Sequence, residues 1–567
     1  MLIPASFSRG NWSVDLQAGA SFGYRPMLFV ILMAGIGAII FQSMACKLGC
    51  VTGLDLATHC RLLLYNRPRY TKLFRYGLLY PLYVLCEIAI ISTDLAELLG
   101  SAIGLCLLFP ALPLWAAVLV TAADVLVFLV IGDPTRGKGR PVRAFEWTVI
   151  GLVFAVLVCF IVLLAQVHAS WPNVFLGFIP SKRLFMTKPN ALYAAVGILG
   201  ATVMPHALFL GSFLATQDRV STPPAPMPHP TNTSARSSTR WSRFRSWFRS
   251  LFSITHSERI AADREHRNKY TYPENNTLDF VQAHLGHGLG DIVVSLLGVA
   301  VPINSAILII AATVFFNREP SRTVNSASVG LFDAHDLIRA HLGKAPALIF
   351  AIALLCAGQT ASITATLAGQ IVSEGFIEWR FSPVLRRLIT RLLGLIPSMA
   401  VAIAFGRDGI DTLLVVSQVI LSIVLPVVVF PLVYFSSSPA LMSVPKPPSP
   451  QTVYPSAPVG TEKEKAEVVI MEAPVIPAMC LDGEDARLPS IPEQTLQEEA
   501  AGVGEERTMD PREREDSRSG LIDFEETVDY SNGWALTTVG YLIWLLVVAA
   551  NVYVIVELIL GAATGTN

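Results

Sequence analysis

Long apolar segments recur along the whole sequence, and each has about the length that a helix needs to cross a bilayer, roughly 20 residues. A shorter apolar segment, 11–22, precedes them. Because backbone N–H and C=O groups cannot stay unpaired in lipid, such segments are predicted to be helices. The sequence therefore predicts an all-α polytopic membrane protein. The long segments are 27–48, 77–105, 111–132, 145–167, 190–215, 288–316, 345–373, 388–405, 411–435 and 534–561.

The composition excludes other classes of protein. Charged residues make up 15% of the chain and the mean hydropathy is +0.53, whereas soluble domains carry roughly 25% charge. The 42 basic and 43 acidic residues nearly balance, so the basic excess of a nucleic-acid-binding protein is absent. No nucleophile–base pair and no phosphate-binding glycine loop stands out. We therefore expect no nucleic-acid partner, no enzyme activity and no cofactor, with the lipid bilayer as the surroundings of the chain.

Two long polar segments interrupt the apolar ones. Segment 216–276 interleaves arginines with aromatic residues, which suits either a helix on an anionic leaflet or a solvated linker. Segment 436–532 begins rich in Pro and Ser and then becomes acidic, a composition typical of disorder. The predicted organisation is thus a core over 1–435 that contains the basic loop, a disordered loop over 436–532, and a final transmembrane helix within 533–567.

Basic residues also mark the orientation. They concentrate in the short loops 49–76, 133–144 and 374–387, and in the long basic loop. The excess of Lys and Arg in cytoplasmic loops predicts that all of these lie in the cytoplasm. There the long loops are candidates for binding trafficking or ubiquitin-ligase adaptors.

The apolar segment 190–215 contains a run that should interrupt its helix, Gly-Ala-Thr-Val-Met-Pro-His. Pro205 lacks an N–H and clashes with the carbonyl of Ala201, so the helix should open there and free that oxygen. Met204 adds a thioether, and sulfur with a bare carbonyl favours transition metals over Mg²⁺ and Ca²⁺. The alternative is a simple proline kink with Met204 as core filler. Gln418, in a later segment, is either an oxygen ligand or an inter-helix hydrogen-bonding group.

Charged residues inside the apolar segments are the second unusual feature. Glu87, Asp94 and Glu97 are spaced to share one face of a helix. An intramembrane carboxylate is costly unless it is paired or hydrated, so three of them indicate a polar pathway. His206 follows the break and can titrate near neutral pH. Arg391 can pair with these acids, and the alternative role of Asp94 or Glu97 is such a structural ion pair.

These features resemble the NRAMP/DMT divalent-metal transporters, with a pattern closest to fungal members. The run at 200–206 resembles the metal motif of the family's sixth helix, and 357–376, which begins Ala-Gly-Gln-Thr-Ala-Ser, resembles its transport signature. Residues 11–19 resemble the segment after the family's first-helix break, and 87–97 resemble its third helix. The resemblance covers most of 10–435 and is weaker over the last apolar segment.

This resemblance implies a LeuT-type fold, in which two inverted five-helix repeats carry broken first and sixth helices. It implies proton-coupled import of divalent ions of the Mn/Fe class, with metal ions and protons as the transported partners, in the plasma membrane or an endosomal or vacuolar membrane. The metal ligands implied by position are Asn11, Ala201, Met204 and Gln418. The implied proton-pathway residues are Asp94, Glu97, His206 and Arg391, with Glu87 as a weaker candidate.

The sequence departs from the family at its first helix. The family motif is Asp-Pro-Gly-Asn, but Ser8-Arg-Gly-Asn11 stands here, so the anionic ligand is absent and the first helix is expected to be incomplete. One explanation is that the coding sequence has been assigned too short at its 5′ end, and that an upstream exon encodes the missing Asp-Pro. The other is a non-transporting regulatory or inactive paralogue. Gly211 also stands where many relatives have a second histidine.

A further alternative is an amino-acid transporter of the same fold. The presence of Met204 at the break argues against it. So does the scarcity of donors for that carboxylate near the break.

Overall fold

The computed structural model describes residues 9–131, 140–185, 191–218, 275–316, 330–341, 343–378, 383–446 and 526–564. The chain divides into two compact units, one formed by Met1–Pro445 with Thr527–Asn567 and the other by Lys446–Glu526. All of the helices and strands named below belong to the first unit. Most of the predicted basic segment 216–276 and of the predicted disordered segment 436–532 lies outside the described residues.

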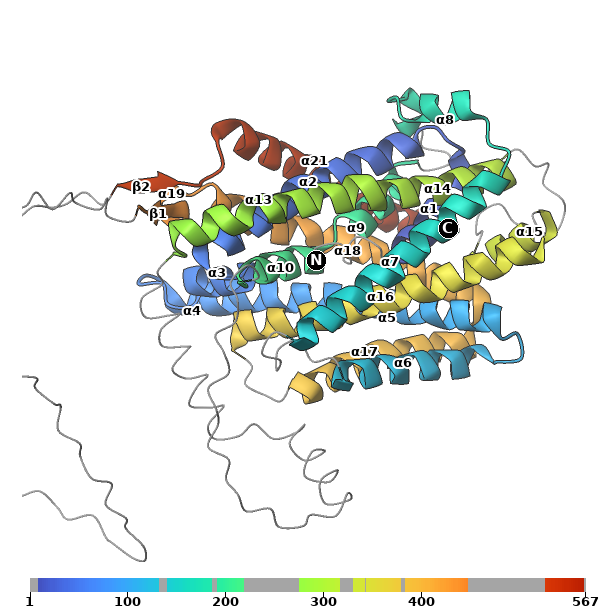
Figure 1. Ribbon diagram of the computed structural model, residues 1–567, viewed down its shortest axis with the longest axis horizontal. Coiled ribbons are helices and arrows are strands. Elements are labelled where there is room, and N and C mark those ends of the chain that lie inside the picture. Colours follow the sequence, from blue (N-terminus) through green and yellow to red (C-terminus); the bar gives the residue numbers. More distant parts are fainter. Residues whose placement is uncertain are drawn as a thin grey trace, which may run out of the picture. The chain divides into compact units, whose positions relative to one another are not determined.

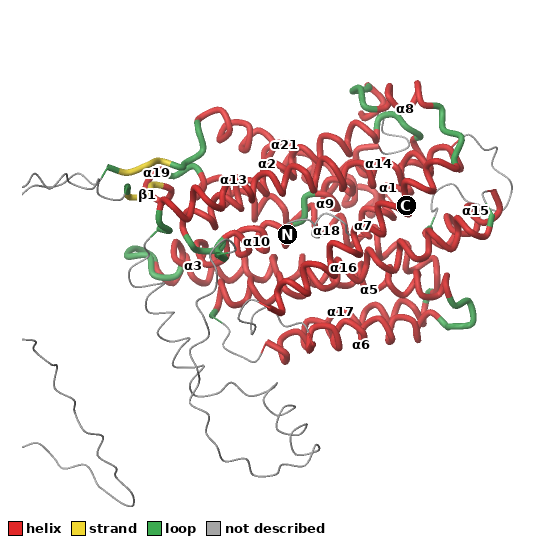
Figure 2. Tube along the Cα trace, in the orientation of Figure 1, coloured by secondary structure: helices red, strands yellow, loops and turns green. Residues whose placement is uncertain are grey.

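Each apolar segment is helical over nearly all of its length, as predicted (Figures 1 and 2). The helices of the first part are α1 (Arg9–Phe22), α2 (Met27–Thr52), α3 (Leu56–Leu64), α4 (Thr71–Phe74), α5 (Tyr80–Leu108), α6 (Leu114–Ile131), α7 (Arg140–Gln166) and α8 (Trp171–Gly177). Those of the second part are α9 (Ala191–Thr202), α10 (Pro205–Ala215), α13 (Leu278–Ser295), α14 (Val301–Ala311), α15 (Leu331–His341), α16 (Lys344–Ile377), α17 (Pro383–Ala404), α18 (Gly406–Ser436), α19 (Pro439–Met442) and α21 (Trp534–Thr564). Short π-helical turns, η2 (Arg75–Leu79), η4 (Leu296–Ala300) and η5 (Ala312–Phe316), extend α5 and α14, and η3 (Lys182–Phe185) is a 3₁₀ turn.

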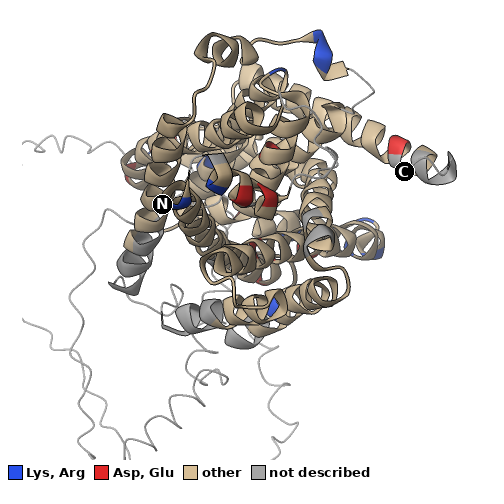
Figure 3. Cartoon of the chain, turned by 90° about the vertical axis from the view of Figure 1, so that its right-hand side faces the viewer, with Lys and Arg blue, Asp and Glu red and all other residues tan. Residues whose placement is uncertain are grey.

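Within the described residues, six helical stretches are long and apolar enough to cross a membrane. Helix α5 is long as well but carries three acidic residues. In the view of Figure 3 most helical positions are uncharged, as expected for helices in lipid, and a few charged positions lie among them. The six stretches are Met27–Thr52, Ala191–Ala215, Leu278–Phe316, Lys344–Ile377, Thr412–Ser436 and Trp534–Glu557.

The helix contacts repeat in pairs. If α1, α2, α5, α6 and α7 form one repeat, then α9–α10, α13–α14, α16, α17 and α18 form the second. Helix α5 packs on its counterpart α16, and α6 on its counterpart α17. The contact of α5 with α18 is mirrored by that of α16 with α7, and the contact of α2 with α10 by that of α1 with α14. A two-fold relation between the repeats produces this pairing, so the LeuT-type prediction is confirmed in its helix packing.

A short antiparallel ladder joins two stretches that flank residues 447–525 in the sequence. Strand β1 (Ser443–Pro445) pairs with β2 (Thr527–Asp529), with Val444 opposite Val528. Asn275 donates its side-chain Nδ2 to the carbonyls of Leu441 and Ser443, at 3.0 and 2.7 Å. The composition of 436–532 did not predict these two strands.

Candidate metal-transport site

The helix break predicted from Pro205 is present. Helix α9 ends at Thr202 and α10 begins at Pro205, and Met204 between them has extended backbone angles, φ −82° and ψ 128°. The N–H of Val203 still bonds to the carbonyl of Leu199, at 2.8 Å. Pro205 has no N–H to offer to the carbonyl of Ala201. The opening therefore leaves that oxygen as a candidate ligand in a fully buried position, since Ala201 is 0% exposed.

Helix α18 approaches this break closely at Gly200. A Cβ atom at that position would lie 2.4 Å from the carbonyl oxygen of Gln418, so only glycine allows the contact. The side chain of Gln418 is 0% exposed, and its Nε2 donates to Ser417 Oγ at 3.1 Å. Its Oε1 accepts no hydrogen bond within the described part of the chain. Helix α18, which carries the Gln418 amide, thus contacts α9 at the residue before Ala201.

Helix α1 reaches the break from the other side. Val14 packs against Gly197 of α9. Helix α2 contacts α9 and, near its own end, the end of α10, so it runs in the same direction as the broken helix. Helix α1 turns back into α2 and therefore runs opposite to α9. One turn from that contact, Asn11 on α1 and Ala201 on α9 therefore lie at the same level. Asn11 is 1% exposed.

The donors gathered here are neutral. Asn11, the Ala201 carbonyl and Gln418 offer oxygen, and Met204 offers sulfur from a buried position against Ala207. No group of three or more His, Cys, Asp or Glu side chains suited to a metal ion occurs among the described residues. Ser8 lies outside them. A thioether beside oxygen donors is a set that discriminates against Mg²⁺ and Ca²⁺.

Buried polar side chains lead away from the break along α5. His206 contacts Thr93 through Nδ1 and Oγ1, 3.3 Å apart. The next residue, Asp94, forms a buried ion pair with Arg391 of α17. Arg391 also donates to Ser362 Oγ of α16 at 2.6 Å. Three helices thus meet at one charged pair.

The remaining predicted acids differ in burial. Glu97 is 0% exposed, whereas Glu87 is only half-buried. The structure brings Asp94 and Arg391 together, as the ion-pair alternative predicted. It adds Thr93 and Ser362, which the sequence reasoning missed. Thr93 adjoins Asp94, and Ser362 lies in the run 357–376, but nothing in their spacing identifies their partners.

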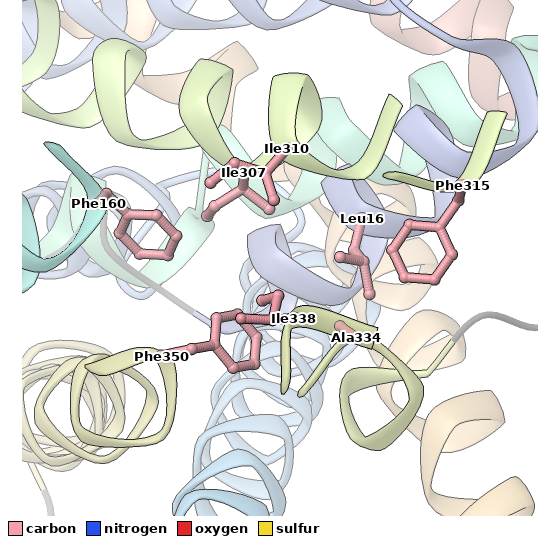
Figure 4. Close-up of a pocket in the computed structure, with 8 residues that line it drawn as sticks. All are labelled: Leu16, Phe160, Ile307, Ile310, Phe315, Ala334, Ile338 and Phe350. Carbon is pink, nitrogen blue, oxygen red and sulfur yellow. The ribbon is translucent and has the colours of Figure 1, made fainter. Parts of the chain in front are cut away.

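A small cavity beside α1 is not part of this site. It is lined only by apolar side chains from α1, α7, α14, η5, α15 and α16 (Figure 4). Its volume is about 10 Å³, near the lower limit for one water molecule. Leu16, Phe160 and Phe350 among its lining offer no ligand atom, so the cavity marks packing around α1.

Comparison with known proteins agrees with this geometry. Residues 5–455 match the family described as Nramp, natural resistance-associated macrophage protein-like. The chain belongs to the Nramp family. The manganese transporter pdt1 of Schizosaccharomyces pombe is 33% identical over 570 residues, which cover 99% of this chain and 85% of that protein. The iron transporter SMF3 of Saccharomyces cerevisiae is 36% identical over 436 residues, covering 77% and 80%.

The Nramp fold is also found among solved structures. A mutant of the Eremococcus coleocola manganese transporter superposes with a TM-score of 0.58 at 27% identity and covers 78% of both chains. The predictions of the family, of a fungal-like member and of the LeuT-type fold are confirmed. These relatives carry the names of transporters, in agreement with the prediction of a transporter rather than an enzyme.

Proposed function

We propose that this Nramp protein imports divalent transition metal ions of the Mn/Fe class together with protons. The observation that carries the proposal is the opened α9–α10 helix, which presents the Met204 thioether and the Ala201 carbonyl in a fully buried position. Discontinuous helices at mid-membrane are where transporters bind their substrates. The names of the relatives support a metal as that substrate.

In this proposal the metal binds between three helices. Asn11 on α1, the Ala201 carbonyl and Gln418 on α18 replace water ligands, and Met204 selects against hard cations. Alternating access follows from movement of one group of helices against the other around this site. The host membrane is proposed to be the plasma membrane or an endosomal or vacuolar membrane, with trafficking or ubiquitin-ligase adaptors binding the long loops.

Protons are proposed to use the polar side chains along α5. His206 lies next to the metal donors and contacts Thr93, whose neighbour Asp94 pairs with Arg391. Glu97 lies one turn further along the same helix, and Glu87 is a weaker member. A proton relay needs groups that can change their hydrogen-bond partners. Arg391 is such a group, because it bonds to Ser362 as well as to Asp94.

The second candidate is a non-transporting regulatory or inactive paralogue. The neutral donor set favours it, because none of these four donors carries the negative charge that would offset the cost of taking a dication out of water.

Uptake by the purified chain in proteoliposomes separates the two. The proposal expects Mn²⁺ entry that rises when the outside is acidified, measured with a Mn²⁺-sensitive dye inside the vesicles. Absence of Mn²⁺ uptake at every pH, with the chain correctly inserted and folded, would support the inactive paralogue. Uptake that ignores the pH gradient would reject proton coupling alone.

A further inference from the structure

Helices α1 and α14 pack against each other, and both carry buried polar side chains that take no part in the proposed metal or proton sites. Asp15 of α1 is 1% exposed, and on α14 Asn304 is 2% and Ser305 is 6% exposed. Within the described residues, Asp15 Oδ2, Asn304 Oδ1 and Ser305 Oγ have no hydrogen-bond partner. Three oxygen atoms buried without donors are a costly arrangement in the interior of a membrane bundle.

The register of the two helices brings these residues to one level. A Cβ at Gly19 would lie 2.6 Å from the Leu308 carbonyl oxygen, so the backbones touch there. Further along, Tyr24 Oη and Thr313 Oγ1 are 2.7 Å apart. The helices therefore run in the same direction. One turn back from Gly19 is Asp15, and one turn back from Leu308 is Asn304.

Neighbouring side chains support the same face-to-face placement. Leu16 on α1 and Ile307 and Ile310 on α14 line the same small cavity (Figure 4). On the other flank, Val14 of α1 and Val301 of α14 belong to one apolar cluster. Around the axis of α1, Asp15 points between Val14 and Leu16. Around the axis of α14, Asn304 points between Val301 and Ile307. The Asp15 carboxylate is thus enclosed between apolar contacts and lies level with Asn304, and Ser305 is the next residue on α14.

We propose that Asp15, Asn304 and Ser305 form a second, oxygen-only subsite for the divalent cation, one turn along α1 from Asn11. This inference rests on the proposed function and deepens it. Carboxylate, amide and hydroxyl oxygens are donors that suit Mn²⁺ and hard divalent cations alike. The subsite supplies the anionic charge that the neutral donors around Met204 lack, and it lies one turn closer to the C-terminal end of α1.

The test uses the purified full chain and Mn²⁺ alone as the probe. Asp15→Asn removes the charge and keeps the shape, and it should raise the KM for Mn²⁺ uptake by about 10-fold, the scale on which the loss of a supporting ligand lowers metal affinity. In a Met204→Ala background, Mn²⁺ binding measured by calorimetry should be weakened but present. It should disappear when Asp15→Asn is added.

Matched serine variants provide the control. Ser305→Ala should weaken Mn²⁺ binding, whereas Ser295→Ala should not, because Ser295 Oγ is already bonded to the Ile292 carbonyl at 3.1 Å. Thermal unfolding without metal tests folding. Asp15→Asn should leave the Tm unchanged or raise it, because it removes a buried charge without a paired group.

The outcomes distinguish the two proposals. If the unmodified chain takes up Mn²⁺ and Asp15→Asn matches it in both KM and binding, the subsite is rejected and the proposed function stands. If Asp15→Asn alters only the pH dependence of uptake, the carboxyl serves protons and the cation subsite is rejected. If the unmodified chain takes up no Mn²⁺ but Asp15-dependent binding remains, the proposed function fails and the subsite stands.

Discussion

At the scale of single residues, Met204 carries the clearest chemical preference. It has extended backbone angles between α9 and α10, and its side chain is 1% exposed. The sequence predicted the break from Pro205, because the missing N–H acts locally. The alternative of a methionine that merely fills the core predicts the same burial, so the two differ only in metal selectivity.

Met204→Ala should therefore lower the ratio of Mn²⁺ to Ca²⁺ uptake by about 10-fold, equivalent to about 1.4 kcal/mol. The reason is that sulfur is the donor that disfavours Ca²⁺. Uptake of each ion into proteoliposomes measures the ratio. Met44→Ala is the control, since Met44 is equally buried but lies on α2 away from the break. An unchanged ratio for Met204→Ala would contradict the ligand assignment.

Arg391→Ala should be strongly destabilising, by about 3–5 kcal/mol, because it leaves the Asp94 carboxylate buried without its partner. Replacing both charges, as in Asp94→Asn with Arg391→Gln, should recover part of the loss. Thermal unfolding of the protein in detergent compares the variants. Equal stability of Arg391→Ala and the unmodified chain would show that the pair does not hold α5 to α17.

At the scale of helices, close approaches decide which elements touch. Gly49 of α2 lies so near α10 that a Cβ there would be 1.9 Å from the Ser212 carbonyl oxygen. Helix α21 is held to α18 by a hydrogen bond rather than by a close glycine contact. Pro426 has no N–H for the Ser422 carbonyl, and Asn551 of α21 donates to that oxygen at 2.7 Å. Both contacts depend on residues distant in sequence, and neither was predicted from the sequence.

Gly49→Ala should separate α2 from α10 and cost about 1–3 kcal/mol, the usual cost of overpacking. Because α10 begins at the break, Mn²⁺ uptake should fall as well. Gly290→Ala in α13 is the matched control, since a Cβ there meets nothing within 4 Å. The Tm and the uptake rate of the two variants should differ, and similar values would refute the close contact.

At the scale of the whole molecule, the described helices and both strands belong to one compact unit, and Lys446–Glu526 form the other. The β1–β2 ladder brings Pro445 opposite Thr527 at the boundary between the units. The end of β1 and the start of β2 are therefore close enough for a short turn to join them in place of residues 447–525.

Replacing 447–525 by a short Gly/Ser turn should leave the helical unit folded and its Mn²⁺ uptake in proteoliposomes close to that of the full chain. Strand ends held side by side need few residues to connect them. Size-exclusion chromatography and uptake test this. A loss of folding would show that the segment contributes to the stability of the helices.

The sequence by itself determined the helices and the α9–α10 break, because hydrophobic length and a missing N–H act within one segment. It also predicted the neutral donor types at the break. Only the tertiary structure decided that Arg391 pairs with Asp94, that Gln418 approaches the break at Gly200, and that Asp15 lies level with Asn304. Those outcomes depend on the register between helices distant in the chain, and helical periodicity shows which face of a helix is polar but not which residue it meets.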